Sequence, residues 1–460
     1  MISSSLSELS AIILAAGEGT RMKSKKSKVL HKVLGKELLN HVIYAAKSAG
    51  SKKICVVVGY KGEEVKKEIG ESVEYAVQEE RLGTGHAVMQ ADSFIKEEGD
   101  VLVLYGDTPL ITGDTLKSLI DTHRKENNGV TILSAIVEDP TGYGRIIRDE
   151  NGNFLKNVEH KDANDEELRV NEINGGMYCF KSKLLKEALK ELTNDNSQKE
   201  YYLTDTLQII LSKGHRVNAL VVKDSNEILG VNSRVQLAEV TQIMKKRINI
   251  RHMEEGVTIV DPETTYIEPD VIIGKDSIIN PGCVLKGRTV IGEDCIIGPN
   301  STIDNSKIAD NVTVQYSVVL ESTVDSDTNI GPFAYIRPNS KIGSHVKIGD
   351  FVEVKNSTIG DNTKVSHLTY IGDADVGERV NFGCGTVVVN YDGKNKHRTT
   401  IGNDAFIGCN ANLVSPVAID EEAFIAAGST ITEDVPAKAL AIARTRQINK
   451  SNWVTKRKEK

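Results

Sequence analysis

A short apolar run near the amino terminus ends in residues that suit an anionic ligand. The run Ala11–Ala16 is followed by Gly17, Gly19, Arg21 and, a little further on, Lys28. Glycines let a backbone approach a ligand closely, successive N–H groups form an anion-binding nest, and the two cations add positive charge. Neither the third glycine of the dinucleotide fingerprint nor the spacing of a P-loop is present. By themselves, these residues are also compatible with a tight strand-to-helix turn bearing surface cations.

A second group of polar residues occurs in the carboxy-terminal half. Its members are Arg337, Lys355, His367, Tyr370, Asn381, Asn390 and Tyr391. An imidazole titrates near neutral pH, which suits a general base, and cations such as Arg and Lys bind phosphates. A lone histidine is more often structural, and a pair of cations is often only solvated. These residues are therefore a candidate site, and the sequence pattern around them decides how they are interpreted.

These surroundings repeat every six residues between Ile267 and Ile431. The first seven aliphatic positions are Ile267, Ile273, Ile279, Leu285, Ile291, Ile297 and Ile303. The small residues at the fifth position are Val271, Ser277, Cys283, Thr289, Cys295 and Ser301. A period of six does not fit a helix, and hexapeptide repeats predict a parallel β-helix in which six residues form one short strand and a corner. With about 18 residues per coil, roughly nine coils are expected.

The six-residue spacing is interrupted near the second polar group. It is regular from Val324 to Val354, slips by one residue before Ile359 and again before Val376, and stops at Asn390–His397. That last segment predicts a projecting loop, because it does not fit a strand of six. We expect the chemistry of this half to lie where the spacing slips.

The rest of the chain predicts an α/β domain over residues 1–231. Strand and helix patterns alternate there, which indicates a Rossmann-like, mainly parallel sheet with ligands at the carboxyl ends of its strands. A linker helix is expected over 232–253, the β-helix over 254–445 and a basic tail without assigned function over 446–460.

Composition limits the classes of function. The 460 residues fit two or three domains, and the net charge of −7 argues against nucleic-acid binding. Six cysteines without a CxxC spacing argue against paired-thiol metal sites and favour a reducing, cytoplasmic location. The run Ala11–Ala16 is too short to span a bilayer and has no basic residue before it, so neither membrane insertion nor a signal peptide is expected.

Taken together, the motifs resemble those of a known family. The amino-terminal motifs are Leu14–Met22, Leu82–Ala87, Leu104–Leu110, Tyr143–Ile146 and Gly230–Asn232. The carboxy-terminal motifs are Tyr335–Pro338, Phe351–Asn356, His367–Gly372 and Asn390–Gly393. Over nearly its full length the chain resembles the bifunctional N-acetylglucosamine-1-phosphate uridyltransferases and glucosamine-1-phosphate acetyltransferases.

The resemblance implies a sequence of two transfers. The β-helix would acetylate glucosamine 1-phosphate from acetyl-CoA, and the α/β domain would join the product to UTP with release of pyrophosphate. The UDP-N-acetylglucosamine formed would feed bacterial peptidoglycan and cell-wall synthesis, and so cell shape. The family also implies a left-handed β-helix and a homotrimer with acetyltransferase sites shared between subunits.

For the α/β domain, the resemblance implies a site for UTP and the nucleotide sugar. Uracil and ribose would be held by Leu14, Ala15, Ala16, Gly17, Gln78, Gly83 and Thr84, and the N-acetyl sugar by Gly144, Glu159 and Asn174. Lys28 and Asn232 would also belong to this site. Asp107 and Asn232 would hold magnesium, which prefers oxygen ligands. Arg21 and Lys28 would neutralise charge during the transfer. Gly175 stands where relatives often have Thr, so we expect one hydroxyl contact near Asn174 to be lost.

For the β-helix, the resemblance implies that His367 is the general base of acetyl transfer. Glucosamine 1-phosphate would be bound by Arg337, Lys355, Tyr370 and Asn381. Acetyl-CoA would be bound by Cys384, Asn390, Tyr391, Cys409, Ala427 and Arg444. Cys384 and Cys409 replace the small Ala and Ser of relatives, so binding should survive while thiol reagents are expected to inhibit.

Two alternatives remain at this point. In the first alternative, the chain is a monofunctional sugar-1-phosphate nucleotidyltransferase with a regulatory β-helix. In the second, the β-helix serves only to assemble trimers. Both predict that glucosamine 1-phosphate causes no release of the CoA thiol.

Overall fold

The computed structural model describes residues 8–196 and 198–458, and it divides into two compact units, Met1–Met244 and Lys245–Lys460. Residues 1–7 of the predicted first domain and residues 459–460 of the predicted tail lie outside the described residues. The described part of the tail contains α9 (Trp453–Lys458). None of the helices in the described part of the chain has both the length and the apolar character needed to cross a bilayer.

The first unit is built on a nine-stranded sheet whose main path is β11-β7-β10-β6-β1-β4-β5. Its strands are β1 (Leu9–Ala15), β4 (Lys53–Val58), β5 (Glu74–Val77), β6 (Asp100–Tyr105), β7 (Val130–Ile136), β8 (Arg145–Arg148), β9 (Phe154–Val158), β10 (Glu172–Lys181) and β11 (Val217–Val221). A separate hairpin joins β2 (Lys32–Val33) to β3 (Lys36–Glu37). The pairs β1–β4, β1–β6, β4–β5 and β7–β11 are parallel, whereas β10 runs antiparallel to β6 and β7.

Helices cover both faces of this sheet. The first face packs against α1 (Leu38–Ser48) and α4 (Gly113–Lys125), and the second packs against α3 (Thr84–Met89), α6 (Ser182–Leu189) and α7 (Asp205–Ser212). Shorter elements are α2 (Gly62–Ile69), α5 (Asp165–Leu168) and the 3₁₀ turns Thr20–Met22, Lys28–Leu30, Gly70–Ser72, Asp92–Phe94 and Ser225–Ile228. Because β1 is buried on both faces, its residues alternate between two cores and read as one apolar run.

The helix expected to link the domains is α8 (Arg234–Glu254). Ser233 caps its start, because its Oγ accepts a hydrogen bond of 3.2 Å from the Gln236 N–H. Val240 is buried in a core of the first unit. Asn249 is buried in the second unit, where its Nδ2 donates to the carbonyls of Pro262 at 3.0 Å and Thr265 at 3.2 Å. The division between the units falls within α8, so each half of the helix is packed rather than exposed as a bare linker.

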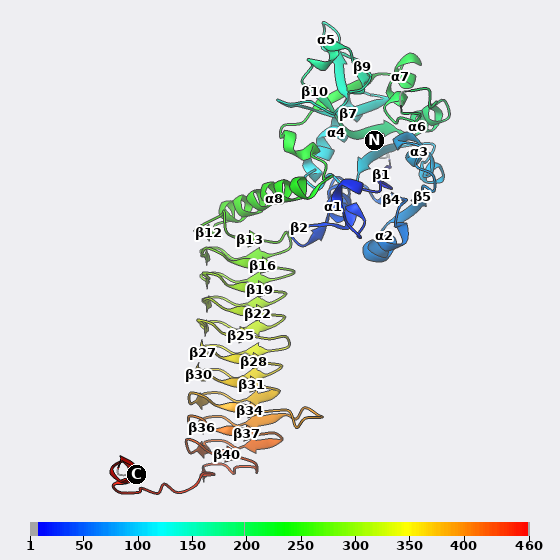
Figure 1. Cartoon of the computed structure of the whole chain (residues 1–460). Coiled ribbons are helices and arrows are strands. Elements are labelled where there is room, and N and C mark those ends of the chain that lie inside the picture. The colour runs from blue at the N-terminus through cyan, green and yellow to red at the C-terminus, as the bar shows by residue number, and fades with distance from the viewer. Residues whose placement is uncertain (1–7, 197, 459–460) are drawn as a thin grey trace, which may run out of the picture. The chain divides into compact units, whose positions relative to one another are not determined.

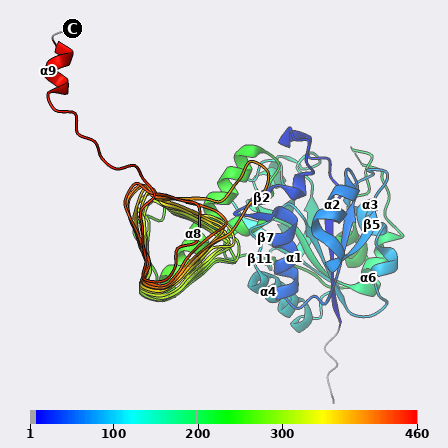
Figure 2. The same cartoon turned by 90° about the horizontal axis from the view of Figure 1, so that it is seen from below.

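The second unit is a parallel β-helix, which Figure 1 shows as stacked coils and Figure 2 as a triangle. Its first sheet contains β12 (Thr258–Ile259), β15 (Ile278–Ile279), β18 (Ile296–Ile297), β21 (Thr313–Val314), β24 (Asn329–Ile330), β27 (Lys347–Asp350), β30 (Lys364–His367), β33 (Asn381–Phe382), β36 (Phe406–Ile407), β39 (Phe424–Ile425) and β41 (Leu440–Ala441). Its second contains β13 (Tyr266–Ile267), β16 (Val284–Lys286), β19 (Thr302–Asp304), β22 (Val318–Leu320), β25 (Tyr335–Ile336), β28 (Glu353–Lys355), β31 (Tyr370–Gly372), β34 (Val387–Val389), β37 (Asn412–Val414) and β40 (Thr430–Ile431). Its third contains β14 (Ile272–Ile273), β17 (Val290–Ile291), β20 (Lys307–Ile308), β23 (Thr323–Val324), β26 (Lys341–Ile342), β29 (Thr358–Ile359), β32 (Ala374–Val376), β35 (Thr399–Ile401) and β38 (Val417–Ile419).

The interior of the β-helix follows the predicted repeat. The aliphatic residue of each six points inward, and the small residues at the fifth position, including Cys283 and Cys295, are fully buried. Buried hydroxyl groups bond to the backbone of the next coil, as when Ser277 Oγ donates to the Gly292 carbonyl at 2.8 Å. The prediction that both thiols fill the core is confirmed.

The prediction that slips in the spacing mark the chemistry was wrong as a rule. Steps of five residues also occur from Ile303 to Ile308 and from Val319 to Val324, where no candidate site residue lies. Left-handed corner residues occur at shorter steps, such as Asn305 with φ of 46°, and also at full six-residue steps, such as Asp294 with φ of 55°. A shortened corner is therefore a general feature of this β-helix.

The projecting loop at Asn390–His397 is confirmed, and Figure 1 shows it beside β34. Tyr391 and Lys396 form a β-bridge across it. At its tip, Asp392 Oδ1 accepts hydrogen bonds from the N–H groups of Lys394 and Asn395 at 2.7 and 2.6 Å. The Asn395 backbone, the His397 side chain and the Lys394 backbone lower the pKa of Asp392 to about 2, so its carboxylate is charged when it orders the loop.

Two neighbouring isoleucines give a matched test of the core. Ile297 is 0% exposed and Ile296, which points outward, is 40% exposed. We expect Ile297→Ala to lower the free energy of unfolding by about 2–5 kcal/mol, and Ile296→Ala to lower it by less than about 1 kcal/mol. Urea denaturation of both variants measures the difference. Equal losses would contradict the inward assignment of the repeat.

Candidate functional site

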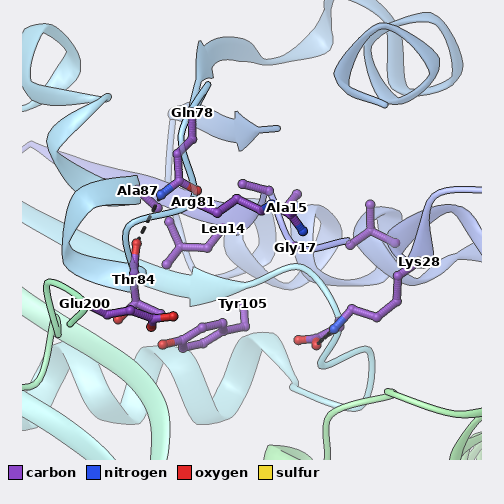
Figure 3. Close-up of a pocket in the computed structure, with 14 residues that line it drawn as sticks. Leu14, Ala15, Gly17, Lys28, Gln78, Arg81, Thr84, Ala87, Tyr105 and Glu200 are labelled. Carbon is purple, nitrogen blue, oxygen red and sulfur yellow. Dashed lines mark hydrogen bonds and ion pairs between the residues drawn. The ribbon is translucent and has the colours of Figure 1, made fainter. Parts of the chain in front are cut away.

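The first unit has a cavity of about 300 Å³ at the carboxyl edge of its parallel strands (Figure 3). It is lined by Leu14, Ala15, Ala16, Gly17, Lys28, Val29, Gln78, Arg81, Gly83, Thr84, Ala87, Tyr105, Asp107 and Glu200. These residues come from the ends of β1 and β6, the 3₁₀ turn Lys28–Leu30, the loop after β5, the start of α3 and, for Glu200, the segment before α7. The edge is the one at which a parallel α/β sheet binds its ligands. The structure thus brings together the residues predicted to hold uracil and ribose.

Two glycines shape this cavity in different ways. Gly83 has φ of 107°, and a Cβ there would lie 2.6 Å from the Tyr201 carbonyl oxygen, so only glycine fits. No atom lies within 4 Å of the place where a Cβ of Gly17 would be. The backbone at Gly17 is therefore open to a ligand, as the sequence predicted.

A cation already occupies the predicted metal position. Lys28 Nζ donates to Asp107 Oδ2 in a short contact and to Asn232 Oδ1 at 3.0 Å. The Val231 N–H donates to the Asp107 carbonyl at 2.8 Å, which ties the two oxygen-bearing segments together. Arg21 is exposed and does not line the described cavity, so its catalytic role stays a prediction.

A second cavity, of about 270 Å³, shares Thr84, Tyr105 and Glu200 with the first. It is lined by the three residues predicted to hold the sugar, Gly144, Glu159 and Asn174. Thr204 Oγ1 donates to Glu159 Oε1 at 3.2 Å, and Asn174 Nδ2 donates to the Tyr178 hydroxyl at 2.9 Å. Burial, and to a lesser degree the Asp107 charge, raises the pKa of Tyr105, so the phenol between the cavities stays protonated and is able to donate.

Close packing explains why position 175 is a glycine in this chain. A Cβ there would lie 2.7 Å from the Leu133 carbonyl oxygen and 2.8 Å from Ile228 Cγ2. Between Asn174 and Met177 the pairing of β10 with β7 shifts register, so the strand is pressed against its neighbours at this point. A threonine at 175 would not fit without movement of the backbone that carries Asn174.

In the β-helix, the predicted phosphate-binding cations lie at the corner between the second and third sheets. Arg337 Nη1 donates to Glu353 Oε1 at 2.8 Å, and Lys355 Nζ donates to Asp373 Oδ2 at 3.4 Å. Contact with Lys355 and the charge of its ammonium group lower the pKa of Lys396 of the projecting loop, so the two side chains are neighbours. Two neighbouring ammonium groups favour a polyvalent anion at this corner.

His367 lies at the other end of the second sheet. It ends β30 and precedes β31, whereas Lys355 pairs with Gly372 at the far end of β31. Tyr370 begins β31, between the two ends. The predicted base and the predicted cation Lys355 therefore lie at the two ends of one three-residue strand, with Tyr370 between them.

Four of the predicted acetyl-CoA residues follow strands of the first sheet in successive coils, at the same corner as His367. They are Cys384, Cys409, Ala427 and Arg444. The N–H of Asn410 donates to the Cys384 carbonyl and the N–H of Gly428 donates to the Cys409 carbonyl, both at 2.8 Å. Asn381 begins β33 of the same sheet.

Asn390 and Tyr391 lie at the opposite corner, away from those four residues. Asn390 is buried and its Nδ2 donates to Asp373 Oδ2. Tyr391 is exposed, and its hydroxyl donates to the Gly393 carbonyl at 2.7 Å. The acetyl-CoA role of these two residues stays a prediction.

The sequence did not single out several residues that the structure adds. Tyr105 lies inside the motif Leu104–Leu110, Arg81 directly precedes the motif Leu82–Ala87, and Lys396 belongs to the projecting loop, so all three were detectable from the sequence. Glu200 had no signal, because it reaches the cavity from a segment with no motif. Asp373 had none either, because its importance comes from contacts with Lys355, Asn356 and Asn390.

Comparisons with known proteins cover both units. Residues 10–231 match the nucleotidyl transferase family, and residues 288–322, 321–356 and 398–433 match bacterial transferase hexapeptide repeats. With the parallel strands described above, these matches confirm the predicted α/β domain and left-handed β-helix. The chain is 59% identical to a protein named "Bifunctional protein GlmU" from Caldanaerobacter subterraneus subsp. tengcongensis, over 99% of both chains. Proteins of the same name from Acetivibrio thermocellus and Clostridium tetani are each 58% identical, over 98% of this chain and 98% and 99% of theirs.

Gly175 and Gly17 differ in the space available for a Cβ, and this difference gives a prediction for the stability of the first unit. We expect Gly175→Ala to lower its free energy of unfolding by about 1–3 kcal/mol, because the new Cβ meets backbone. Gly17→Ala is expected to change it by less than about 1 kcal/mol, because the space is open. Chemical denaturation measures the free energy of unfolding of both variants. Wild-type stability of Gly175→Ala would show that the backbone of β10 can move to make room for the Cβ.

Proposed function

The chain belongs to the family of bifunctional GlmU proteins, and from that membership we propose how its two sites carry the two transfers. It is a glucosamine-1-phosphate N-acetyltransferase and an N-acetylglucosamine-1-phosphate uridylyltransferase. Acetyl-CoA and UTP are its co-substrates, and UDP-N-acetylglucosamine is its product. The proposal assigns acetyl transfer to the β-helix and uridylyl transfer to the α/β unit.

The paired cavities of the α/β unit are the observation that carries the assignment of uridylyl transfer. UTP would enter the cavity lined by Gly17 and Gln78, and the sugar would enter the one lined by Glu159 and Asn174. Because the two cavities share Tyr105, the sugar phosphate would lie next to the UTP phosphates. A phosphate oxygen of the sugar would then bond to the α-phosphorus while the bond to pyrophosphate breaks. Positioning and charge neutralisation supply most of the catalysis in such transfers.

The residues present suit a magnesium ion. The carboxylate of Asp107 and the amide oxygen of Asn232 point at one cation, the Lys28 ammonium. Oxygen ligands of this kind hold Mg²⁺ together with substrate phosphates and water, so a larger cluster of protein carboxylates is unnecessary. Bound there, the ion would neutralise charge on the phosphates. Lys28, and Arg21 by resemblance, would add positive charge from the protein.

The acetyl-transfer site supports a homotrimer. His367 and Lys355 lie at the two ends of β31 on an outer face of the β-helix, so a neighbouring chain packed at the His367 corner would help to enclose the substrates. An apolar ridge runs along the same corner as His367, and Tyr316, Phe333, Phe351 and Leu368 expose large side chains on it. Ring centroids along the ridge are 5.6 and 5.5 Å apart. A continuous exposed apolar patch of this kind is typical of an interface, and the proposed occupant is a second copy of this chain.

We also propose a cytoplasmic location. UTP and acetyl-CoA are intracellular metabolites, and all six cysteines of the described structure are unpaired. A reducing compartment is consistent with both.

Crossed substitutions test the division of work. Asp107→Ala is expected to reduce magnesium-dependent pyrophosphate release by about 100-fold or more, because a ligand to the metal is lost, and to leave acetyl transfer intact. His367→Ala is expected to reduce release of the CoA thiol by about 100- to 10,000-fold and to leave uridylyl transfer intact. Full pyrophosphate release by Asp107→Ala would refute the metal site. Absence of CoA release by the wild type would favour the monofunctional alternative.

Charge on the ridge tests the oligomer. We expect Phe333→Asp with Phe351→Asp to convert a species of three times the chain mass into monomers, since two carboxylates would be buried in the interface. Light scattering during size-exclusion chromatography measures the mass. Ile272→Asp, which places the same charge at an exposed apolar position of the third sheet, is the matched control. Loss of the oligomer in the control alone, or in neither protein, contradicts the assignment of the ridge.

A further inference from the structure

The strand pair that carries His367 is longer than its neighbours. β27 and β30 each run four residues, whereas β24 and β33 of the same sheet run two. The additional residues extend the pairing, so that Asp350 and His367 become register partners in adjacent coils. Their juxtaposition is therefore set by backbone pairing.

Gly349 permits this close approach of the two coils. A Cβ at Gly349 would lie 1.9 Å from the Ser366 carbonyl oxygen. On the other side, the Leu368 N–H donates to the Asp350 carbonyl at 2.9 Å. The backbone is thus fixed on both sides of the Asp350–His367 pair.

The side chains of the pair are joined by a hydrogen bond. His367 Nδ1 and Asp350 Oδ1 are 2.6 Å apart. The bond to His367 is the largest effect on Asp350 and lowers its pKa, so the carboxyl group is ionised and has no proton to donate. Nδ1 is therefore the donor, and a neutral imidazole with its proton on Nδ1 keeps a free lone pair on Nε2.

We propose that Asp350 is a positioning residue for acetyl transfer, which holds His367 in the Nδ1–H tautomer and leaves Nε2 free to accept the proton of the substrate amine. The inference rests on the proposed role of His367 as general base. As the amine nitrogen bonds to the thioester carbonyl carbon, Nε2 takes the proton from that nitrogen. The C–S bond then breaks, and the same proton passes from Nε2 to the departing CoA thiolate.

The competing explanation is an ion pair that only joins two coils. Both side chains are partly exposed, and surface pairs contribute little to stability. The chain offers a matched comparison in His345 and Asp327, which also come from adjacent coils, with Nε2 and Oδ2 3.9 Å apart. No predicted site residue lies in that pair.

A double-mutant cycle separates the two explanations. We expect Asp350→Ala to lower kcat of CoA release by about 10- to 100-fold, as for other orienting partners of a functional histidine, with little change in KM. Asp350→Asn should recover much of the rate, because its amide oxygen accepts the same Nδ1–H bond. Asp350→Ala should cost nothing further in a His367→Ala background, because Asp350 acts only through His367. Asp327→Ala should match the wild type, and circular dichroism of every variant checks that the β-helix is folded.

Two results would overturn the inference alone while leaving His367 as the base. One is a wild-type kcat for Asp350→Ala when His367→Ala is slow. The other is an equal loss from Asp350→Ala in both backgrounds, which would mean that Asp350 acts independently of His367. A wild-type kcat for His367→Ala would overturn both the proposed base and the inference.

Discussion

The register between successive coils is the constraint on which the second unit depends. In a parallel β-helix each residue lies beside its counterpart one coil later, so one choice of spacing fixes both the interior and the surface. Inside, it stacks aliphatic side chains such as Ile279 and Ile297 in columns. Outside, the same register stacks Glu353 on Tyr370 and Asp350 on His367. The polar groups of the surface are therefore held by the packing of the core.

In the first unit, polar groups are brought together by the ends of parallel strands rather than by stacked coils. Its parallel strands end at one edge, and loops from that edge carry Gly17, Asp107 and Asn232 into one place. Backbone groups there are open to a ligand, and the oxygen atoms of Asp107 and Asn232 converge on Lys28. A cation between two oxygen ligands is electrostatically reasonable in a site made for polyphosphate, because the ligand brings further negative charge.

The two proposed sites differ in how complete they are within one chain. The paired cavities of the first unit are formed by that unit alone. In the β-helix, Lys355 and His367 lie at the two ends of β31, on an outer face of the prism. Among the described strands of the prism the connecting corners are short, apart from the loop at Asn390–His397. This geometry is the physical reason that an oligomer is part of the proposal for acetyl transfer.

The sequence by itself determined the two folds and supplied most of the candidate residues of both proposed sites, because periodicity and glycine placement are local properties. The six-residue repeat predicted which side chains are buried, and the motifs identified Gly17, Asp107 and His367. Only the tertiary structure decided which distant groups meet. Lys28 and Asn232 are 204 positions apart, and the packing of Gly175 depends on Ile228. The Asp350–His367 pair depends on how many residues each coil contains, and this number varies along the chain. Such contacts depend on register and on through-space packing, which no local pattern encodes.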